Sequence, residues 1–263
     1  MRATRLPILM YHSVATSPAA ATRRLAVRPA EFAAQLALLQ AEGMTTLPFT
    51  DVAAALHEDR PLPPRTVVLT FDDGYADFHE VAFPLLQRYG CTATLFVTTG
   101  WLDDAGEHRA GRPLDRMLSW RQLDEVASAG IEIGAHSHSH AQLDQLPTRL
   151  LEWELRTSKA LLEDRLGKPV PSLAYPFGYW NAGVRKAVRA AGYRHAAAVA
   201  NTTVQPRHDS LALPRLTVRE STALDVFQRI VHSRRIARTF AVDRTLTAGW
   251  AVIRRARATS RGR

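Results

Sequence analysis

The stretch Val67-Val68-Leu69-Thr70-Phe71-Asp72-Asp73-Gly74-Tyr75 carries both a structural and a chemical signal. Its first five residues are apolar or β-branched, which predicts a buried strand. Two adjacent carboxylates, Asp72 and Asp73, then follow at the carboxyl end of that strand. An Asp-Gly pair is also ordinary turn chemistry. Whether the carboxylates take part in a reaction therefore depends on what other strands bring to the same edge.

The rest of the chain alternates short strand-like runs with longer helical patterns. Strands are predicted at about residues 7–13, 66–70, 92–97, 131–135, 172–175, 195–199 and 213–218. Pro29 and Gly43 bound one predicted helix, and Ser119 and Asn181 are placed to cap two others. This alternation predicts a mostly parallel sheet. The expected fold class is α/β, an irregular (β/α) barrel of about seven parallel strands.

Composition narrows the function classes. Of the 263 residues, 46% are hydrophobic and 22% are charged, the balance of an ordinary globular protein. The single cysteine, Cys91, excludes an intrachain disulfide and a cysteine-built metal site. We see no signal segment and no run of about 20 apolar residues, so a cytoplasmic location is expected.

The net charge of +9 belongs to the last part of the chain. Residues 229–263 hold ten arginines and one acid, whereas residues 1–228 carry equal numbers of bases and acids. We expect one barrel domain over residues 1–240 and a poorly ordered, Arg-rich tail over residues 241–263. The tail lacks interleaved aromatic residues and any nucleic-acid motif, so no specific nucleic-acid partner is expected. A solvated extension is the simplest interpretation, and weak contact with an anionic membrane or another polyanion is the alternative.

A second polar cluster follows the predicted strand at residues 131–135. It reads His136-Ser137-His138-Ser139-His140, with the outer histidines four residues apart. One helical turn at this spacing places both imidazoles on one side, as in paired histidine metal ligands. Taken alone, the cluster is equally well a solvated loop. With a carboxylate of the Asp-Asp pair, it favours a metal site of two nitrogens and one oxygen, suited to zinc and also to iron, cobalt or nickel.

The next predicted strand leads into a third segment, Tyr175-Pro176-Phe177-Gly178. Proline and glycine mark a shaped loop, in which aromatic rings can stack on a sugar and a backbone N–H can face an oxyanion. Core packing is the alternative for the aromatic side chains, above all for Tyr175.

These segments, in this order, resemble the polysaccharide deacetylase family, also called carbohydrate esterase family 4 or the chitooligosaccharide deacetylase homology domain. The resemblance covers about residues 6–232 and rests on Thr70-Phe71-Asp72-Asp73-Gly74 and His136-Ser137-His138-Ser139-His140. Leu9-Met10-Tyr11-His12-Ser13-Val14 and the 175–178 loop are similar to the subgroup that includes bacterial poly-N-acetylglucosamine deacetylases.

The resemblance implies an enzyme that hydrolyses carbon–nitrogen bonds. Its reaction would be the metal-dependent removal of acetyl groups from an N-acetylated sugar or polysaccharide of the N-acetylglucosamine type. One divalent metal ion, Zn²⁺ foremost, would be held by Asp73, His136 and His140.

The resemblance also implies roles in proton transfer. Asp72 would be the general base and His12 the general acid. His232 is a weaker rival for the acid, because it falls in a predicted helix outside the barrel. The 175–178 loop would contact the substrate, and the backbone N–H of Phe177 would face the oxyanion.

One feature departs from the family pattern. Many members have an arginine that pairs with the catalytic aspartate, and Ala174 stands at that position here. Arg215 near the end of the last predicted strand is a candidate substitute, and a purely structural salt bridge is an equal alternative for it. Two other functions stay open, namely hydrolysis of another amide or imide on the same fold and a non-catalytic glycan- or anion-binding module.

Overall fold

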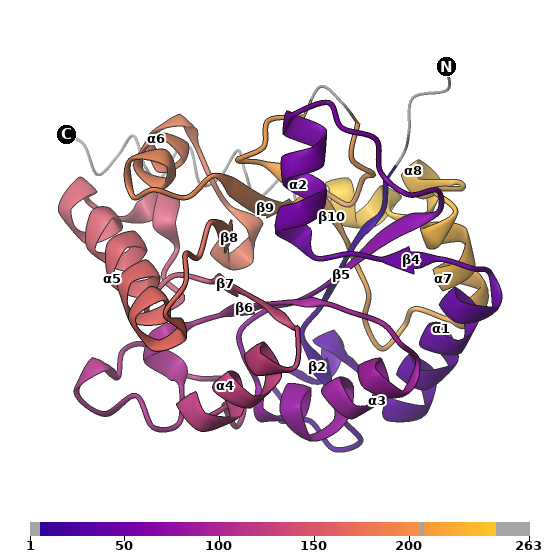
Figure 1. Ribbon diagram of the computed structural model, residues 1–263, viewed down its shortest axis with the longest axis horizontal. Coiled ribbons are helices and arrows are strands. Elements are labelled where there is room, and N and C mark those ends of the chain that lie inside the picture. The colour runs from indigo at the N-terminus through magenta and orange to yellow at the C-terminus, as the bar shows by residue number, and fades with distance from the viewer. Residues whose placement is uncertain (1–5, 206–207, 246–263) are drawn as a thin grey trace.

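The structure is a computed structural model that describes residues 6–205 and 208–245. The strands of its central ring are β1 (Ile8–Tyr11), β5 (Thr66–Phe71), β6 (Thr94–Val97), β7 (Glu132–Ala135), β8 (Ser172–Ala174), β9 (His195–Val199) and β10 (Leu213–Thr217). They pair in parallel in the order β1-β10-β9-β8-β7-β6-β5, and β5 pairs again with β1 (Figure 1). The predicted (β/α) barrel is confirmed.

Three short strands lie outside this ring. β4 (Thr45–Thr46) pairs with the first residues of β5, and β2 (Ser13–Val14) pairs with β3 (Ala26–Val27). The sequence pattern did not reveal β3 or β4, because a two-residue strand is too short to display a period of two. The strand predicted at residues 7–13 is divided into β1 and β2, and His12 lies between them.

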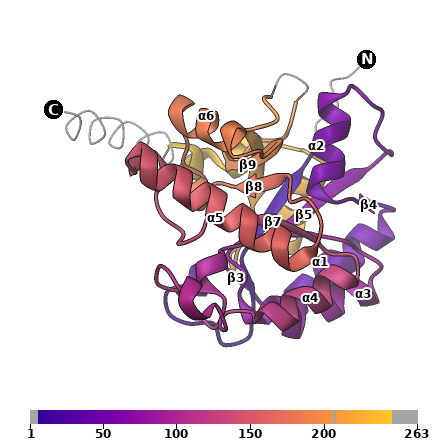
Figure 2. The same ribbon diagram turned by 60° about the vertical axis from the view of Figure 1, so that its left-hand side comes forward.

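Helices surround the ring (Figures 1 and 2). Short helical turns lie in the segments that connect the helices and strands. The α-helices are α1 (Pro29–Ala41), α2 (Phe49–His57), α3 (Phe83–Arg88), α4 (Trp120–Ser128), α5 (Thr148–Leu166), α6 (Ala182–Ala190), α7 (Leu224–Val231) and α8 (Ile236–Thr239). The short turns are η1 (Arg23–Leu25), the π-helical η2 (Phe78–Ala82), η3 (Thr99–Trp101), η4 (Gly106–His108), η5 (Leu143–Gln145) and η6 (Pro176–Gly178). Figure 2 shows α5 across the front of the molecule, beside α6 and against β7.

The predicted caps are present. The hydroxyl of Ser119 accepts the backbone N–H of Gln122, whose side chain accepts the backbone N–H of Ser119 in return. Such a capping box satisfies two otherwise unpaired donors at the start of α4. Asn181 Oδ1 accepts the backbone N–H of Val184 at the start of α6.

Side-chain alternation along β1 and β5 determines which residues face the inside of the ring at its carboxyl end. Ile8, Val68 and Phe96 face the inside of the ring, where Phe49 and Val52 of α2 complete a buried apolar cluster. Successive side chains of a strand point to opposite faces. Counting on by twos from Ile8 and Val68 therefore reaches His12 and Asp72, at the carboxyl end of the ring.

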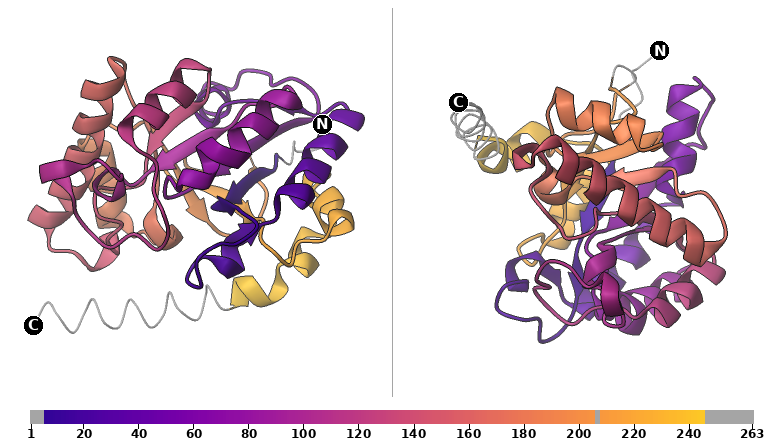
Figure 3. Two further views of the ribbon diagram at one scale, coloured as in Figure 1. Left: turned by 90° about the horizontal axis from the view of Figure 1, so that it is seen from below. Right: turned by 90° about the vertical axis from the view of Figure 1, so that its left-hand side faces the viewer.

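The chain's last described helices pack on the outside of the ring. Figure 3 shows α7 beside α1, although the two helices are far apart in the sequence. Of the predicted tail, residues 246–263 lie outside the described residues. Near the start of that tail, Asp243 pairs with Arg219 at 2.8 and 2.9 Å. Among the described residues, no helix combines the length and the apolar character needed to cross a membrane.

Candidate active site

The carboxyl ends of two strands bring the predicted metal ligands together. Asp73 follows β5, and His136 and His140 follow β7, with β6 between them in the ring. Asp73 Oδ1 lies 3.4 Å from His136 Nε2 and 3.2 Å from His140 Nε2. One ligand atom from each residue falls within 4.8 Å of the other two. These three residues can therefore hold one metal ion.

The hydrogen bonding of this triad fits a cation. Asp73 Oδ1 is buried and accepts no well-directed hydrogen bond, although both imidazole nitrogens are close to it. A buried carboxylate oxygen without a directed partner is costly unless a ligand compensates it. The Nδ1–H of His136 donates to the carbonyl of Ala174 at 2.8 Å. This bond leaves Nε2 free to coordinate, as the outer hydrogen bond of a metal-binding histidine normally does.

The backbone around the triad is held in unusual conformations. Asp73, Ser137, His140 and Phe177 all have positive φ angles, of 75°, 62°, 61° and 59°. Each such conformation in a non-glycine residue costs about 1–3 kcal/mol and persists where its surroundings impose it. These four residues belong to the three segments that form the site, so the surrounding structure imposes their conformation there.

Glu154 of α5 braces the histidine loop, a role that no motif in the sequence indicates. Its Oε2 accepts the backbone N–H groups of His138 at 2.9 Å and Ser139 at 2.8 Å, and its Oε1 accepts the Ser139 hydroxyl. Glu154 is only 4% exposed. A signal did exist, because this acid shares a helix face with the buried Leu151 and Leu155.

The second carboxylate of the pair, Asp72, is bound to Arg215. The two terminal nitrogens of Arg215 donate to Asp72 Oδ1 and Oδ2 at 2.6 and 2.7 Å, and Nη1 also donates to Thr70 Oγ1 at 3.1 Å. Both side chains are buried, with 0% and 3% exposure. Burial alone would raise the pKa of Asp72, but Arg215 and His136 outweigh it and hold the pKa below its usual value. Asp72 is therefore ionised at neutral pH, beside the triad.

His12 lies in the same site. Its charge interacts with those of Asp73, Asp72, Arg215 and His136. Burial lowers the pKa of His12, and the two carboxylates only partly offset that effect. Its Nδ1 is buried without a hydrogen-bond partner.

Two other histidines lie away from this centre. His232 ends α7 and pairs with Glu42, outside the ring. His138 turns towards Thr99, whose hydroxyl lies 2.9 Å from its Nδ1, and towards the ring of Trp153.

The 175–178 loop supplies one wall of the site. The Phe177 ring is about half exposed and lies 4.6 Å from the His140 ring. Tyr175 is buried, and its hydroxyl donates a hydrogen bond to the carbonyl of Leu211 at 2.7 Å. Tyr175 therefore packs in the core, which was the alternative considered from the sequence. Pro176 is buried, and Gly178 has a φ of 73° with the side chain of Val199 where a Cβ would lie. The loop shape thus requires glycine at this position and presents Phe177 at the mouth.

A family model described as polysaccharide deacetylase matches residues 59–196, just over half of the chain. The chain belongs to the polysaccharide deacetylase family. In this polysaccharide deacetylase family member, the matched residues include the candidate metal triad and Asp72. His12 and Arg215 fall outside the match, so their place in the site rests on the structure.

Individual relatives agree with this assignment. The chain is 31% identical over 190 residues to the YxkH protein of Bacillus subtilis, covering 72% of this chain and 63% of YxkH. It thus spans a little under two thirds of that relative's length. It is 26% identical over 218 residues to the poly-beta-1,6-N-acetyl-D-glucosamine N-deacetylase of Staphylococcus epidermidis, covering 80% of this chain and 72% of that protein.

Solved structures of the family superpose well on this barrel. The Streptococcus pyogenes deacetylase PplD, in complex with acetate, matches with a TM-score of 0.78 at 26% identity, over 87% of this chain and 99% of that one. IcaB from Ammonifex degensii matches with a TM-score of 0.74 at 26% identity, over 87% of this chain and 96% of that one.

Proposed function

We propose that this protein is a metal-dependent deacetylase that hydrolyses the N-acetyl groups of an N-acetylglucosamine-type sugar or polysaccharide. The observation that carries the proposal is the metal-binding triad next to an ionised Asp72 that Arg215 holds in place. In this arrangement the Asp73 carboxylate can bind a cation, and the neighbouring Asp72 carboxylate can accept a proton.

The donor set of Asp73, His136 and His140 favours Zn²⁺, with iron, cobalt or nickel as alternatives. A bound divalent cation supplies carbonyl polarisation and a lowered pKa for water. The chain's own residues supply the fixed geometry. His136 is oriented by the Ala174 carbonyl, and His140 lies against the Trp101 and Phe177 rings.

Proton transfer is assigned to the two side chains that flank the triad. Asp72 takes a proton from the attacking water, whose oxygen bonds to the acetyl carbon. His12 in its protonated form gives a proton to the sugar nitrogen as the carbon–nitrogen bond breaks, and acetate and the free amine leave; the proton that Asp72 has taken from water then reprotonates His12. The backbone N–H of Phe177 faces the oxygen that gains negative charge. In this assignment Arg215 positions Asp72 and keeps it ionised.

The substrate class is supported by the mouth of the site and by the relatives. Phe177 is a half-exposed aromatic residue beside His140, and sugar rings stack on such side chains. The Staphylococcus epidermidis relative is a deacetylase of poly-beta-1,6-N-acetyl-D-glucosamine. We further propose the barrel domain at residues 1–240 and the basic tail at 241–263, with weak contact of the tail to an anionic membrane or polyanion.

The test combines metal analysis with acetate release from N-acetylglucosamine oligomers. We expect about one divalent ion per chain, lost on dialysis in His136→Ala and His140→Ala, because two protein ligands make too weak a chelate. Asp73→Asn should lose the metal as well. Asp72→Asn should keep it and lose about 10²–10⁴-fold in turnover.

Two results would oppose the proposal. Full metal content and activity in both histidine variants would place the site elsewhere. Bound metal without acetate release from any N-acetylated sugar, but with hydrolysis of other amides or imides, would assign a different substrate to the same site.

A further inference from the structure

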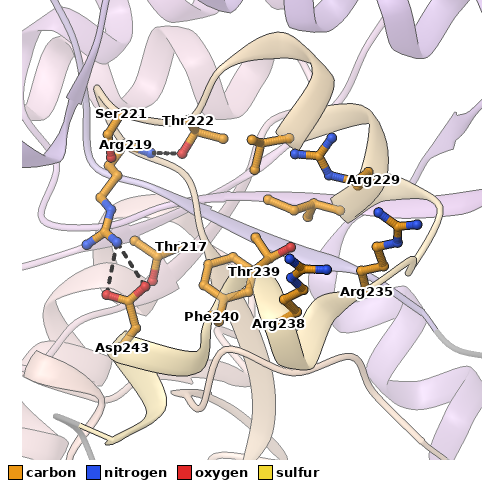
Figure 4. Close-up of a pocket in the computed structure, with 12 residues that line it drawn as sticks. Thr217, Arg219, Ser221, Thr222, Arg229, Arg235, Arg238, Thr239, Phe240 and Asp243 are labelled. Atoms are coloured by element: carbon orange, nitrogen blue, oxygen red, sulfur yellow. Dashed lines mark hydrogen bonds and ion pairs between the residues drawn. The ribbon is translucent and has the colours of Figure 1, made fainter.

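A second concave site lies between α7 and α8, away from the residues proposed for catalysis. This α7–α8 groove has a volume of about 490 Å³, within the range of small-molecule sites. Its lining residues are Thr217, Arg219, Ser221, Thr222, Val226, Arg229, Ile230, Arg235, Arg238, Thr239, Phe240 and Asp243 (Figure 4). None of them belongs to the metal triad, to the Asp72–Arg215 pair or to the 175–178 loop.

The groove is strongly cationic at one end. Figure 4 shows Arg229, Arg235 and Arg238 gathered on one side. Arg229 pairs with Asp225 at 2.8 Å, but within the described part of the chain Arg235 and Arg238 have no carboxylate partner. Guanidinium groups brought together without acids repel one another. An anion placed between them would relieve that repulsion.

The other end of the groove is polar and close to neutral. Arg219 donates to both carboxylate oxygens of Asp243, and its backbone N–H donates to the Thr222 hydroxyl. Thr217 lies beside this ion pair, and Ser221 lies near the backbone end of Arg219 (Figure 4). The Ser221 and Thr222 hydroxyls at this end can bond neutral hydroxyls of a ligand.

An apolar surface joins the two ends. Ile230 and Phe240 are buried parts of the main core, and Val226 packs partly buried against it. A ligand that fits the groove therefore carries an anion at one end, a short carbon chain in the middle and hydroxyl groups at the other end.

We propose that the α7–α8 groove binds the phosphate ester of a small polyol. Arg235 and Arg238, with Arg229 beside them in its pair with Asp225, offer more donors than the two oxygens of a carboxylate can accept, whereas a phosphate presents three or more oxygens. A glycerol phosphate group occurs in soluble glycerol phosphate, a monoester with three unesterified oxygens, and in the headgroup of a glycerophospholipid, a diester with two unesterified and two ester oxygens. This site is independent of the proposed deacetylation, because the two share no residue.

The experiment measures binding of two probes to the full chain as purified. Calorimetric titration with glycerol 3-phosphate tests the soluble source, with glycerate as the carboxylate control. Co-sedimentation with phosphatidylglycerol vesicles, against phosphatidylcholine vesicles, tests the lipid source. Saturable binding of glycerol 3-phosphate supports a soluble ligand, and retention on phosphatidylglycerol alone supports a lipid headgroup.

Matched variants separate the groove from general charge. Arg235→Gln with Arg238→Gln should weaken binding at least about tenfold, the loss expected for charge-assisted hydrogen bonds. Arg234→Gln with Arg244→Gln removes the same charge from positions outside the groove that are exposed, as Arg235 and Arg238 also are, and should change the affinity by no more than about twofold. His140→Ala should leave binding unchanged, which excludes phosphate binding at the metal centre.

Three outcomes would overturn the proposal. They are the absence of binding to either probe, equal losses in the two double arginine variants, and binding abolished by His140→Ala. The Arg235 and Arg238 variant should retain full acetate release from a small substrate, so failure of this proposal and failure of the proposed deacetylation would be seen separately.

Discussion

Arg215→Met tests how the buried ion pair supports both stability and catalysis. Arg215 is fully buried, and it donates two short hydrogen bonds to Asp72 and one to Thr70. Methionine fills much of the volume but leaves the Asp72 carboxylate buried without its counter-charge. Removing one partner of a buried pair costs about 3–5 kcal/mol. That loss is a large share of a typical folding free energy of about 5–15 kcal/mol.

The pH dependence gives this prediction its sign. In the native chain the pKa of Asp72 lies below its unfolded value, so the pair contributes stability above about pH 4 and loses it as the pH falls. Without the guanidinium, the pKa of Asp72 rises, because burial is then opposed only by the neighbouring histidines His136 and His12. As the pH falls, protonation of Asp72 removes its unpaired buried charge, and the variant becomes less destabilised. The stability gap between native chain and variant should be largest near neutral pH and should narrow toward pH 4.

The assay is denaturant unfolding of both chains at neutral pH and near pH 5. Arg185→Met is the matched control, because Arg185 pairs with Asp209 at 2.7 Å but both side chains are about one-third exposed. A partly exposed pair of this kind is worth no more than about 1 kcal/mol. The reasoning is refuted if Arg215→Met loses no more stability than Arg185→Met, or if its deficit is the same at both pH values.

Three further predictions address single residues. His12→Ala should keep its metal and lose turnover on amides far more than on an activated aryl acetate, whose leaving group needs no proton; equal losses, or an amide-selective defect in His232→Ala, would move the acid elsewhere. Glu154→Gln should weaken metal affinity about 10–100-fold by loosening the histidine loop, whereas the exposed Glu152→Gln should not, as metal titration of both variants would reveal. Burial lowers the pKa of His195 to about 4, so the native chain should lose stability as the pH falls from about 6.5 to 4; melting curves of His195→Leu should lack this component, and identical pH profiles would contradict it.

Local signals predicted the parts of this structure that depend on neighbours in the chain. The run ending at Phe71 formed a strand because its apolar residues had to be buried, and Ser119 capped a helix because its hydroxyl reaches a backbone N–H three residues away. The division of the first predicted strand at His12 was not foreseen. It depends on the separate pairing of Ser13 with Ala26, a contact made across the fold.

The residue pattern alone was enough to place two carboxylates and two histidines at the carboxyl ends of strands. Because parallel strands of a barrel end at one edge, this pattern predicted a metal site. The partners of these residues depend on how the ring closes and on how the helices pack around it. Arg215 lies 143 positions from Asp72, and it reaches that carboxylate because β10 and β5 both flank β1 in the closed ring. Glu154 meets the histidine loop only through the packing of α5 against β7. Period and spacing state which way a side chain points along its own element, but the partner it meets there depends on the three-dimensional arrangement of elements distant in the chain.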